Sequence, residues 1–277
     1  MTTLEGTAGR FLALHHRGHP LLQPNAWDVG SARLLESLGF EAIATTSSGF
    51  AATLGRLDGS VTRDEALGHG AQLAGAVAVP VAADTENGFA DDPAGVAETV
   101  RLACATGLAG CSIEDFTGRP DDAIYDIALA AERVAAAVEA AHGGPTQLVL
   151  TARAENLIHN LPDLPDTITR LQAYQEAGAD VLFAPGLSTL EDIRAVVSSV
   201  DRPVNVLAMP SCPPIEELSS VGVARVSVGG AFAYAAFAGL ISAARELRDD
   251  GTFGYWDQVA GARRSIRDAF VAPEARR

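Results

Sequence analysis

Lysine is absent from this chain of 277 residues, so all 20 of its basic residues are arginine. No side-chain amine is available to form a Schiff base with a carbonyl substrate or with pyridoxal phosphate. A P-loop lysine and a lysine general base are excluded for the same reason. Pyridoxal phosphate is therefore excluded as a cofactor, NAD is not expected, and electron withdrawal from a carbonyl must come from another group.

Positive charge is also scarce, because 35 acidic residues leave a net charge of −15. Nucleic-acid binding needs clustered positive charge, so we expect no nucleic-acid partner. No apolar run approaches the roughly 20 residues that span a bilayer, and the N-terminal segment lacks the pattern of a signal peptide. The cysteines are Cys104, Cys111 and Cys212, an odd number that suits a reducing compartment. We expect a cytoplasmic protein without a membrane partner.

A short apolar or β-branched run followed by a longer segment of helical apolar spacing recurs along the chain, at intervals of roughly 20 to 38 residues. The eight runs begin near Leu21, Glu41, Val79, Gly110, Gln147, Asp180, Pro203 and Val223. This alternation is typical of a (β/α)8 TIM barrel, which we assign to residues 1–250. Asp92-Pro93 and the pair Ser188 and Glu191 indicate two of the helix starts.

A C-terminal helical extension is expected over residues 251–277, after a helix near 231–247 that completes the barrel. Its helix spans Tyr255–Phe270 and carries the apolar side chains of Tyr255, Trp256, Val259, Ile266 and Phe270. An apolar helix without a barrel strand of its own must pack somewhere. Two alternatives are open, an interface between subunits and packing across its own barrel.

Acidic residues follow two neighbouring strands at the end where a TIM barrel carries its active site. Asp84 and Glu86 alternate along one strand, so both carboxylates point to the same face, and Glu114 ends the next strand. Three converging carboxylates repel one another unless a cation lies among them, and oxygen ligands suit Mg²⁺ or Mn²⁺. The alternative is that Glu86 or Asp115 caps a helix or pairs with an arginine.

Arg153 ends the strand that begins near Gln147, on the same face. Its guanidinium either neutralises the carboxylates or holds an anionic substrate. The turn Ser47-Ser48-Gly49 offers N–H and hydroxyl groups for a carboxylate or phosphoryl oxygen. Cys111 lies inside a strand and is expected in the core. His15, His16 and His19 precede the first strand and are expected at the surface.

Several stretches together carry a resemblance to a known superfamily. They are PNAWDVGSARLLESLGFEAIATTSSG, VPVAADTENGF, GLAGCSIED, LVLTARAE, AGADVLFAPG and RPVNVLA. The chain resembles the phosphoenolpyruvate mutase/isocitrate lyase superfamily over most of its length. This resemblance implies a Mg²⁺-dependent barrel that acts on small anionic 2-oxo acids or enol phosphates, and a dimer or tetramer that exchanges C-terminal helices.

The resemblance also implies roles for individual residues. It assigns the metal to Asp84, Glu86 and Glu114, with Asp58 near the metal through water, although the residue matching Glu86 is usually aspartate. The matched substrate-contacting residues are Trp27, Ser47, Ser48, Gly49, Phe50, Arg153 and Asn205.

One loop departs from the superfamily pattern. The isocitrate-type lyases carry a lysine-lysine-cysteine-glycine-histidine loop, whereas Phe116–Asp122 contains neither lysine nor cysteine. The loop also lacks the asparagine-bearing gate of the mutases. The resemblance therefore places the chain in a divergent branch whose reaction the superfamily does not fix.

The predicted function is a Mg²⁺-dependent lyase that cleaves a C–C bond of a small 2-oxo acid or a malate-like substrate through a metal-stabilised enolate. Arg153 would hold the departing acid, and Arg119 would close a loop over the substrate. The proton carrier is open among Asp58, His159 and a metal-bound water. The alternatives are a phosphonomutase, a P–C hydrolase or a decarboxylase of the same superfamily, and a non-catalytic ligand-binding barrel.

Overall fold

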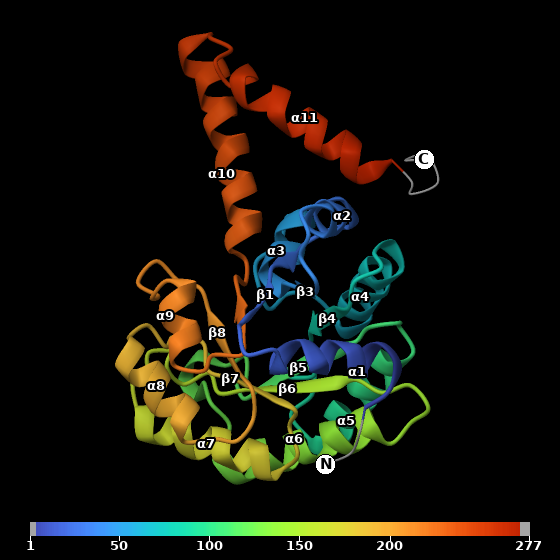
Figure 1. Cartoon of the computed structure of the whole chain (residues 1–277), viewed down its shortest axis with the longest axis vertical. Helices are drawn as coiled ribbons and strands as arrows, with labels where there is room; N and C mark the ends of the chain where they lie inside the picture. The colour runs from blue at the N-terminus through green and yellow to red at the C-terminus, as the bar shows by residue number, and fades with distance from the viewer. Residues whose placement is uncertain (1–3, 272–277) are drawn as a thin grey trace.

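A sheet of parallel strands forms the centre of the protein in the computed structural model, which describes residues 4–271 (Figure 1). Its strand order is β1-β9-β8-β7-β6-β5-β4-β3-β2. The first predicted strand is divided into β1 (Leu21–Gln23), which pairs with β9, and β2 (Asn25–Ala26), which pairs with β3. Because these two pieces are consecutive in the chain, the sheet closes on itself. The predicted (β/α)8 barrel is confirmed.

Each remaining predicted run contains one strand of this barrel. The strands are β3 (Ile43–Thr45), β4 (Val81–Asp84), β5 (Gly110–Glu114), β6 (Val149–Arg153), β7 (Val181–Phe183), β8 (Val204–Leu207) and β9 (Arg225–Ser227).

Helices follow the strands and surround the barrel. They are α2 (Val29–Ser37), α3 (Ser47–Thr53), α4 (Arg63–Ala76), α5 (Pro93–Cys104), α6 (Ile127–His142), α7 (Leu164–Glu176), α8 (Leu190–Ser198) and α9 (Ile215–Ser220). The start of α5 is confirmed, because the Asp92 side chain accepts a hydrogen bond from Gly95 N ahead of Pro93. The predicted cap of α8 at Ser188 is wrong. The helix begins one residue later, and the hydroxyl of Thr189 accepts the hydrogen bond from Asp192 N.

Alternation along the strands divides the interior into an apolar layer and a polar centre. Leu150, Val206 and Val226 face the helices and are buried in the main hydrophobic core. Their neighbours Thr151 and Asn205 point into the barrel. This pattern follows from the two-residue period of a strand, and it reserves the centre of the barrel for polar chemistry.

The N-terminal segment closes the lower end of the barrel. Helix α1 (Gly6–Ala13) and the 3-10 turn Leu14–His16 pack Phe11 and Leu14 against the first residues of several strands, among them Val149 and Val181. The chain thus crosses the ends of the strands opposite to the predicted active site.

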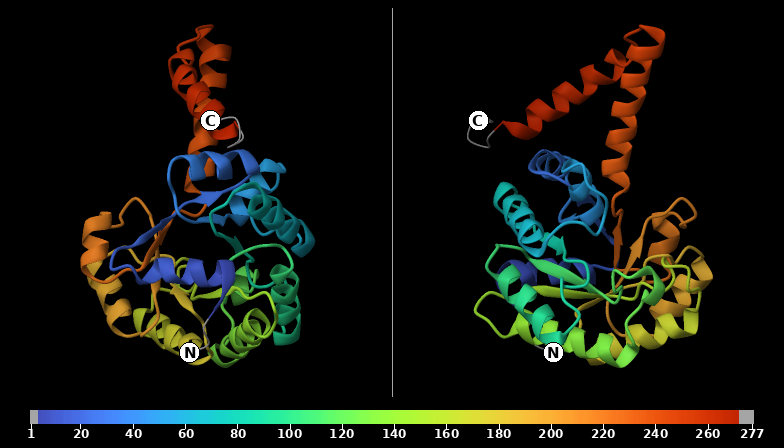
Figure 2. Two further views of the ribbon diagram at one scale, coloured as in Figure 1. Left: turned by 45° about the vertical axis from the view of Figure 1, so that its right-hand side comes forward. Right: turned by 180° about the vertical axis from the view of Figure 1, so that it is seen from behind.

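An arm of two helices projects from the barrel (Figures 1 and 2). Helix α10 (Ala231–Arg245) continues through a π-helical turn at Glu246–Asp250, and α11 (Trp256–Phe270) returns to pack beside α2. Both predicted helices form, but α10 projects away from the barrel instead of completing it. The arm nevertheless leaves large apolar side chains exposed, with Leu240 64% and Phe253 60% accessible. Within residues 4–271, no helix has the length and apolar character needed to cross a membrane.

Gly110 offers a test of how closely β5 and β6 pack. A Cβ atom at this position would lie 2.7 Å from the carbonyl oxygen of Val149 and 3.0 Å from Cε1 of Phe11. We expect Gly110→Ala to lower the free energy of unfolding by about 1 to 3 kcal/mol, because backbone atoms must move. Urea denaturation followed by circular dichroism measures the change.

Gly75→Ala is the matched control, since nothing lies within 4 Å of a Cβ atom there and the residue is in helix α4. It should raise the stability by up to about 1 kcal/mol through helix propensity. Equal stability of Gly110→Ala and the unmodified protein would contradict the packing described.

Candidate active site

A cavity of about 210 Å³ lies inside the barrel and reaches the C-terminal ends of the strands. Its upper wall includes Ser47, Asp58, Asp84 and Arg153, and its lower wall includes Gln23, Asn25, Cys111, Thr151 and Arg225. This is the face at which TIM barrels carry their active sites. The size suits a small acid rather than a nucleotide.

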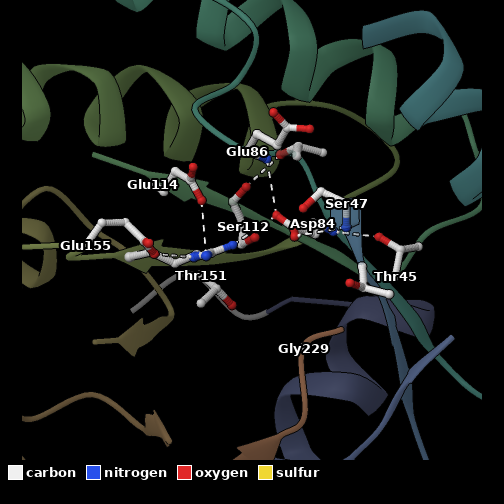
Figure 3. A network of polar contacts seen from close by, with 12 residues as sticks. Thr45, Ser47, Asp84, Glu86, Ser112, Glu114, Thr151, Glu155 and Gly229 are labelled. Atoms are coloured by element: carbon white, nitrogen blue, oxygen red, sulfur yellow. Dashed lines mark hydrogen bonds and ion pairs between the residues drawn. The ribbon is translucent and has the colours of Figure 1, made fainter. Parts of the chain in front are cut away.

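The guanidinium of Arg153 contacts three carboxylates, and their residues Asp84, Glu114 and Glu155 are labelled in Figure 3. Its Nη1 lies 2.9 Å from Asp84 Oδ1, its Nη2 3.1 Å from Glu114 Oε2, and its Nε 2.8 Å from Glu155 Oε1. Burial opposes the charge of Arg153, but Glu155, Glu114 and Asp84 outweigh it and raise its pKa well above the ordinary value. Of the two roles left open for Arg153, neutralisation of the carboxylates is the one present in the structure.

Carboxyl groups outnumber positive charges around Arg153. Burial raises the pKa of Glu114 well above its ordinary value, and Glu155, Asp84 and Glu86 add to the effect against the attraction of Arg153. Burial also raises the pKa of Glu86 to about 7, with Asp84 and Asp58 as further causes. Carboxylates crowded in this way are stabilised by an additional cation.

The carboxylates do not converge as a ready metal cage. In the part of the chain that the structure describes, no group of three histidine, cysteine, aspartate or glutamate side chains is arranged to hold a metal ion. Asp84 and Glu114 instead bind different nitrogen atoms of Arg153. The oxygen donors and the surplus of negative charge still fit a Mg²⁺ or Mn²⁺ ion, provided that side chains turn away from Arg153.

Glu86 lies two residues after the end of β4 in a strained backbone position, so the prediction that it continues the strand of Asp84 is wrong. Its φ of 47° lies in the left-handed region that non-glycine residues seldom adopt. Its N–H donates to Asp84 Oδ1 over 3.2 Å, and its carbonyl oxygen accepts from Glu114 N over 3.0 Å. The two hydrogen bonds fix the turn, as is common where strain is stored at functional sites.

The predicted Ser47-Ser48-Gly49 turn is the first turn of helix α3. Thr46 caps it, with its hydroxyl accepting from Gly49 N over 3.3 Å, and Ser47 N donates to Asp84 Oδ2 over 3.4 Å. A Cβ atom on Gly49 would lie 2.5 Å from Thr46 Cγ2, so glycine is required there. Ser47 and Ser48 line the cavity, whereas Phe50 stacks on His69 with ring centres 3.9 Å apart.

The other predicted residues divide into two groups. Asp58 and Asn205 line the cavity. Trp27 packs beside Gly49, outside the lining, and His159 stacks on Phe116 with ring centres 3.8 Å apart. Arg119 is not brought to the cavity, because its Nη1 lies 3.1 Å from the carboxylate oxygens of Asp91.

Asp115 supports the site from the opposite face of the sheet. Its carboxylate accepts hydrogen bonds from Glu155 N over 2.8 Å, Arg170 Nη1 over 3.2 Å and the Tyr174 hydroxyl over 2.5 Å. Pairing with an arginine was one of the alternatives for this residue, and it is the one observed. Asp115 thereby links helix α7 to the backbone of Glu155, which in turn orients Arg153. Cys111 is buried in β5, as predicted.

The sequence did not predict Arg225 at the floor of the cavity, and it placed its neighbour His15 at the surface. His15 is only 4% exposed, so its expected surface position is wrong. Its Nδ1 donates to Phe11 O over 3.0 Å, and its Nε2 lies 3.2 Å from Arg225 Nη1. The error arises because α1 folds under the barrel and carries the turn of His15 inside. An arginine within the apolar run VARVSV was the available signal for Arg225.

Residues 11–248 match the family of phosphoenolpyruvate phosphomutase. The chain belongs to this family. The resemblance to the phosphoenolpyruvate mutase/isocitrate lyase superfamily is therefore confirmed, and the superfamily includes 2-methylisocitrate lyases and oxaloacetate decarboxylases among its enzymes.

Individual relatives agree with this placement. A solved Burkholderia cenocepacia protein, named as a lyase/mutase, is 50% identical, covers 96% of both chains and has a TM-score of 0.92. The Escherichia coli 2-methylisocitrate lyase is 30% identical over 80% of this chain and 78% of its own length. An oxaloacetate decarboxylase of Rhodopseudomonas palustris is 31% identical over 73% and 71%. A phosphonopyruvate hydrolase solved with oxalate and Mg²⁺ shares the fold at 24% identity, covers 92% of this chain and 91% of its own, and has a TM-score of 0.81.

The buried His15 makes the stability of the fold depend on pH. Burial first, and then the charge of Arg225, lowers the pKa of His15 from 6.5 to about 3. Between these values the unfolded chain binds a proton at His15 and the folded chain does not, so acidification favours unfolding. The cost is up to about 1.4 kcal/mol for each pH unit.

His15→Gln keeps an acceptor for Arg225 but cannot be protonated. We expect the melting temperature of the unmodified protein to fall more steeply than that of the variant between about pH 6.5 and pH 4. Thermal unfolding across this range measures both slopes, and parallel profiles would show that His15 is protonated in the fold.

Proposed function

We propose that the protein is a Mg²⁺-dependent lyase that cleaves a C–C bond of a small 2-oxo acid or substituted malate through an enolate. The observation that carries this proposal is the surplus of carboxylates around Arg153 at the end of the cavity that active sites occupy. The E. coli relative is a lyase for a substituted acid of this kind. The cavity volume also suits such a substrate.

Asp84, Glu86 and Glu114 would hold the metal, with Asp58 near it through water. Mg²⁺, or Mn²⁺ in its place, supplies a Lewis acid that stabilises the negative charge of an enolate when it is bound. Arg153 keeps Asp84 and Glu114 at the cavity, and its guanidinium turns to the departing acid group once their charge is otherwise balanced. Ser47 and Ser48 contribute hydroxyl groups for the substrate carboxylate, and Gly49 lets Thr46 pack against the turn that carries them.

A malate that carries a methyl group on C2 gives pyruvate and a second acid when its C2–C3 bond is cleaved. A base removes the proton of the 2-hydroxyl group, the C2–C3 bond breaks, and C2 becomes the carbonyl carbon of a 2-oxo acid. The electron pair of the broken bond passes to C3 and its carboxyl group, and a proton then returns to C3. Asp58 lines the cavity and can carry this proton, whereas His159 lies outside the lining.

Decarboxylation is the second candidate, because a 31% identical relative is an oxaloacetate decarboxylase. In that reaction the C3–C4 bond of oxaloacetate breaks, CO₂ leaves, and the electron pair enters the enolate of pyruvate. The same residues would serve both reactions. Pyruvate and the second product can be measured with oxaloacetate, substituted malates and phosphonopyruvate as substrates. The substrate accepted and its second product distinguish C–C cleavage, decarboxylation and P–C cleavage.

Asp84→Asn tests the catalytic proposal. We expect pyruvate release from the accepted substrate to fall about a hundredfold or more, because several kcal/mol of charge stabilisation in the transition state is lost. EDTA should abolish the activity of the unmodified protein, and added Mg²⁺ should restore it. Steady-state kinetics of pyruvate release measures these effects.

Asp201→Asn makes the same chemical change at an exposed residue away from the cavity and should leave the rate unchanged. Full activity of Asp84→Asn in the presence of EDTA would refute the proposal. Turnover of none of the three substrate classes, combined with thermal stabilisation by Mg²⁺, would favour a ligand-binding barrel.

The helical arm supports a proposal about assembly. Leu240, Phe253 and Trp256 are large, apolar and between 49% and 64% exposed. Surfaces of this kind are covered in assemblies of identical chains. We propose that the arm packs against a second copy in a dimer or tetramer, and that the exchanged extension is residues 251–277, of which 272–277 lie outside the described residues. Arg119 remains proposed as a residue of a closing loop.

Two substitutions test the assembly. Leu240→Asp with Phe253→Asp should reduce the mass measured by light scattering to that of a monomer, because two charges cannot be buried unpaired. Leu102→Asp, on helix α5 outside the arm, is the control and should leave the mass unchanged. An unaltered mass for the double variant would exclude the arm as the interface.

A further inference from the structure

Arg225 lies at the floor of the cavity, on β9, with only 5% of its surface exposed. Three hydrogen bonds hold its guanidinium. The Nε atom donates to Asn205 Oδ1 over 3.0 Å, Nη2 donates to Thr151 Oγ1 over 3.3 Å, and Nη1 lies 3.2 Å from His15 Nε2. Each partner is an uncharged group, so the guanidinium is fixed in position without being neutralised.

His15 acts as an acceptor toward Arg225 and not as a second cation. Its Nδ1 faces Phe11 O, which can only accept a hydrogen bond, so the proton of the neutral ring lies on Nδ1. Its Nε2 is then free to accept from Arg225. Burial keeps His15 neutral at physiological pH, with a pKa lowered to about 3.

The charge of Arg225 has no counter-ion within the part of the chain that the structure describes. Among residues 4–271, its hydrogen-bond partners include no carboxylate. Burial lowers its pKa to about 9, and the charge of Arg153 adds to this, so it remains protonated at neutral pH. An isolated buried cation is costly. Arg153 presents the opposite case, because it contacts three carboxylates.

Arg225 also has N–H groups that its three hydrogen bonds do not use. A guanidinium carries five N–H groups, and the contacts to Asn205, Thr151 and His15 use three of them. The remaining N–H groups belong to a side chain that lines the cavity. A positive charge, unused donors and a cavity wall together are the features of a site for a carboxylate.

We propose that Arg225 binds a carboxylate of the substrate at the floor of the cavity, so that the enzyme takes acids with two anionic groups. Asp58, Asp84 and Arg153 line the upper end of the cavity, where a metal would bind, and Arg225 lines its floor, so such an acid would lie with one anionic group at each end. Asn205 and His15 are positioning residues for the guanidinium. That the bound carboxylate belongs to the substrate rests on the proposed lyase function, whereas the binding of a carboxylate at Arg225 does not.

Binding of butyrate and of butyramide, measured by ligand-observed NMR in EDTA, tests the subsite without metal or turnover. The two probes have the same shape and differ in charge. The unmodified protein should bind butyrate about tenfold more tightly or better, because a charge-assisted hydrogen bond is at stake. Arg225→Met should remove this preference. Arg194→Met, an exposed arginine on α8, should retain it.

Two results would overturn the subsite, namely no preference for butyrate in the unmodified protein and an undiminished preference in folded Arg225→Met. Circular dichroism establishes that the variant is folded, and Arg225→Gln, which keeps a polar group beside Asn205, replaces it if it is not. Butyrate selectivity together with failure to turn over any of the acids would refute the lyase and leave the subsite standing. Turnover of one of the acids by a protein that shows no preference for butyrate would refute the subsite and leave the lyase standing.

Discussion

The balance of charge around one guanidinium governs the upper half of the barrel. Glu114 and Arg153 are direct neighbours in the register of β5 and β6, and Asp84 comes from the adjoining β4. The register of the parallel strands therefore places these residues side by side, whatever conformation their side chains adopt. Because one positive charge faces several carboxylates, the site is incomplete electrostatically, and a cation is the simplest group that completes it.

This balance depends on contacts outside the barrel. Glu155 is held through its backbone N–H by Asp115, and Asp115 is held by Arg170 and Tyr174 from helix α7. The helix layer thus fixes the position of a group that contacts Arg153. Support of this kind is what keeps side chains of an active site in one geometry.

Local patterns in the sequence predict the barrel and the residues at its strand ends. The eight runs locate the strands because strand and helix periodicities are local properties, and the chain order then fixes which ends share a face. Asp84, Glu114 and Arg153 follow from this reasoning. Their pairing does not, because whether Arg153 meets a substrate or its neighbours depends on distances between side chains. The contact between His15 and Arg225 could not be predicted, since the two residues are 210 positions apart and meet only in the folded barrel.

The absence of lysine bears on the floor of the cavity as well as on the chemistry. Burial there lowers the pKa of Arg225 to about 9, which still leaves a cation at neutral pH. The ordinary pKa of a lysine amine is lower than that of a guanidinium, so the same burial would bring the pKa of an amine closer to neutral pH and remove more of its charge. The planar guanidinium also donates hydrogen bonds to Asn205, Thr151 and His15 at the same time. A single ammonium group does not present its donors in this arrangement. A permanent positive charge in this interior therefore requires arginine.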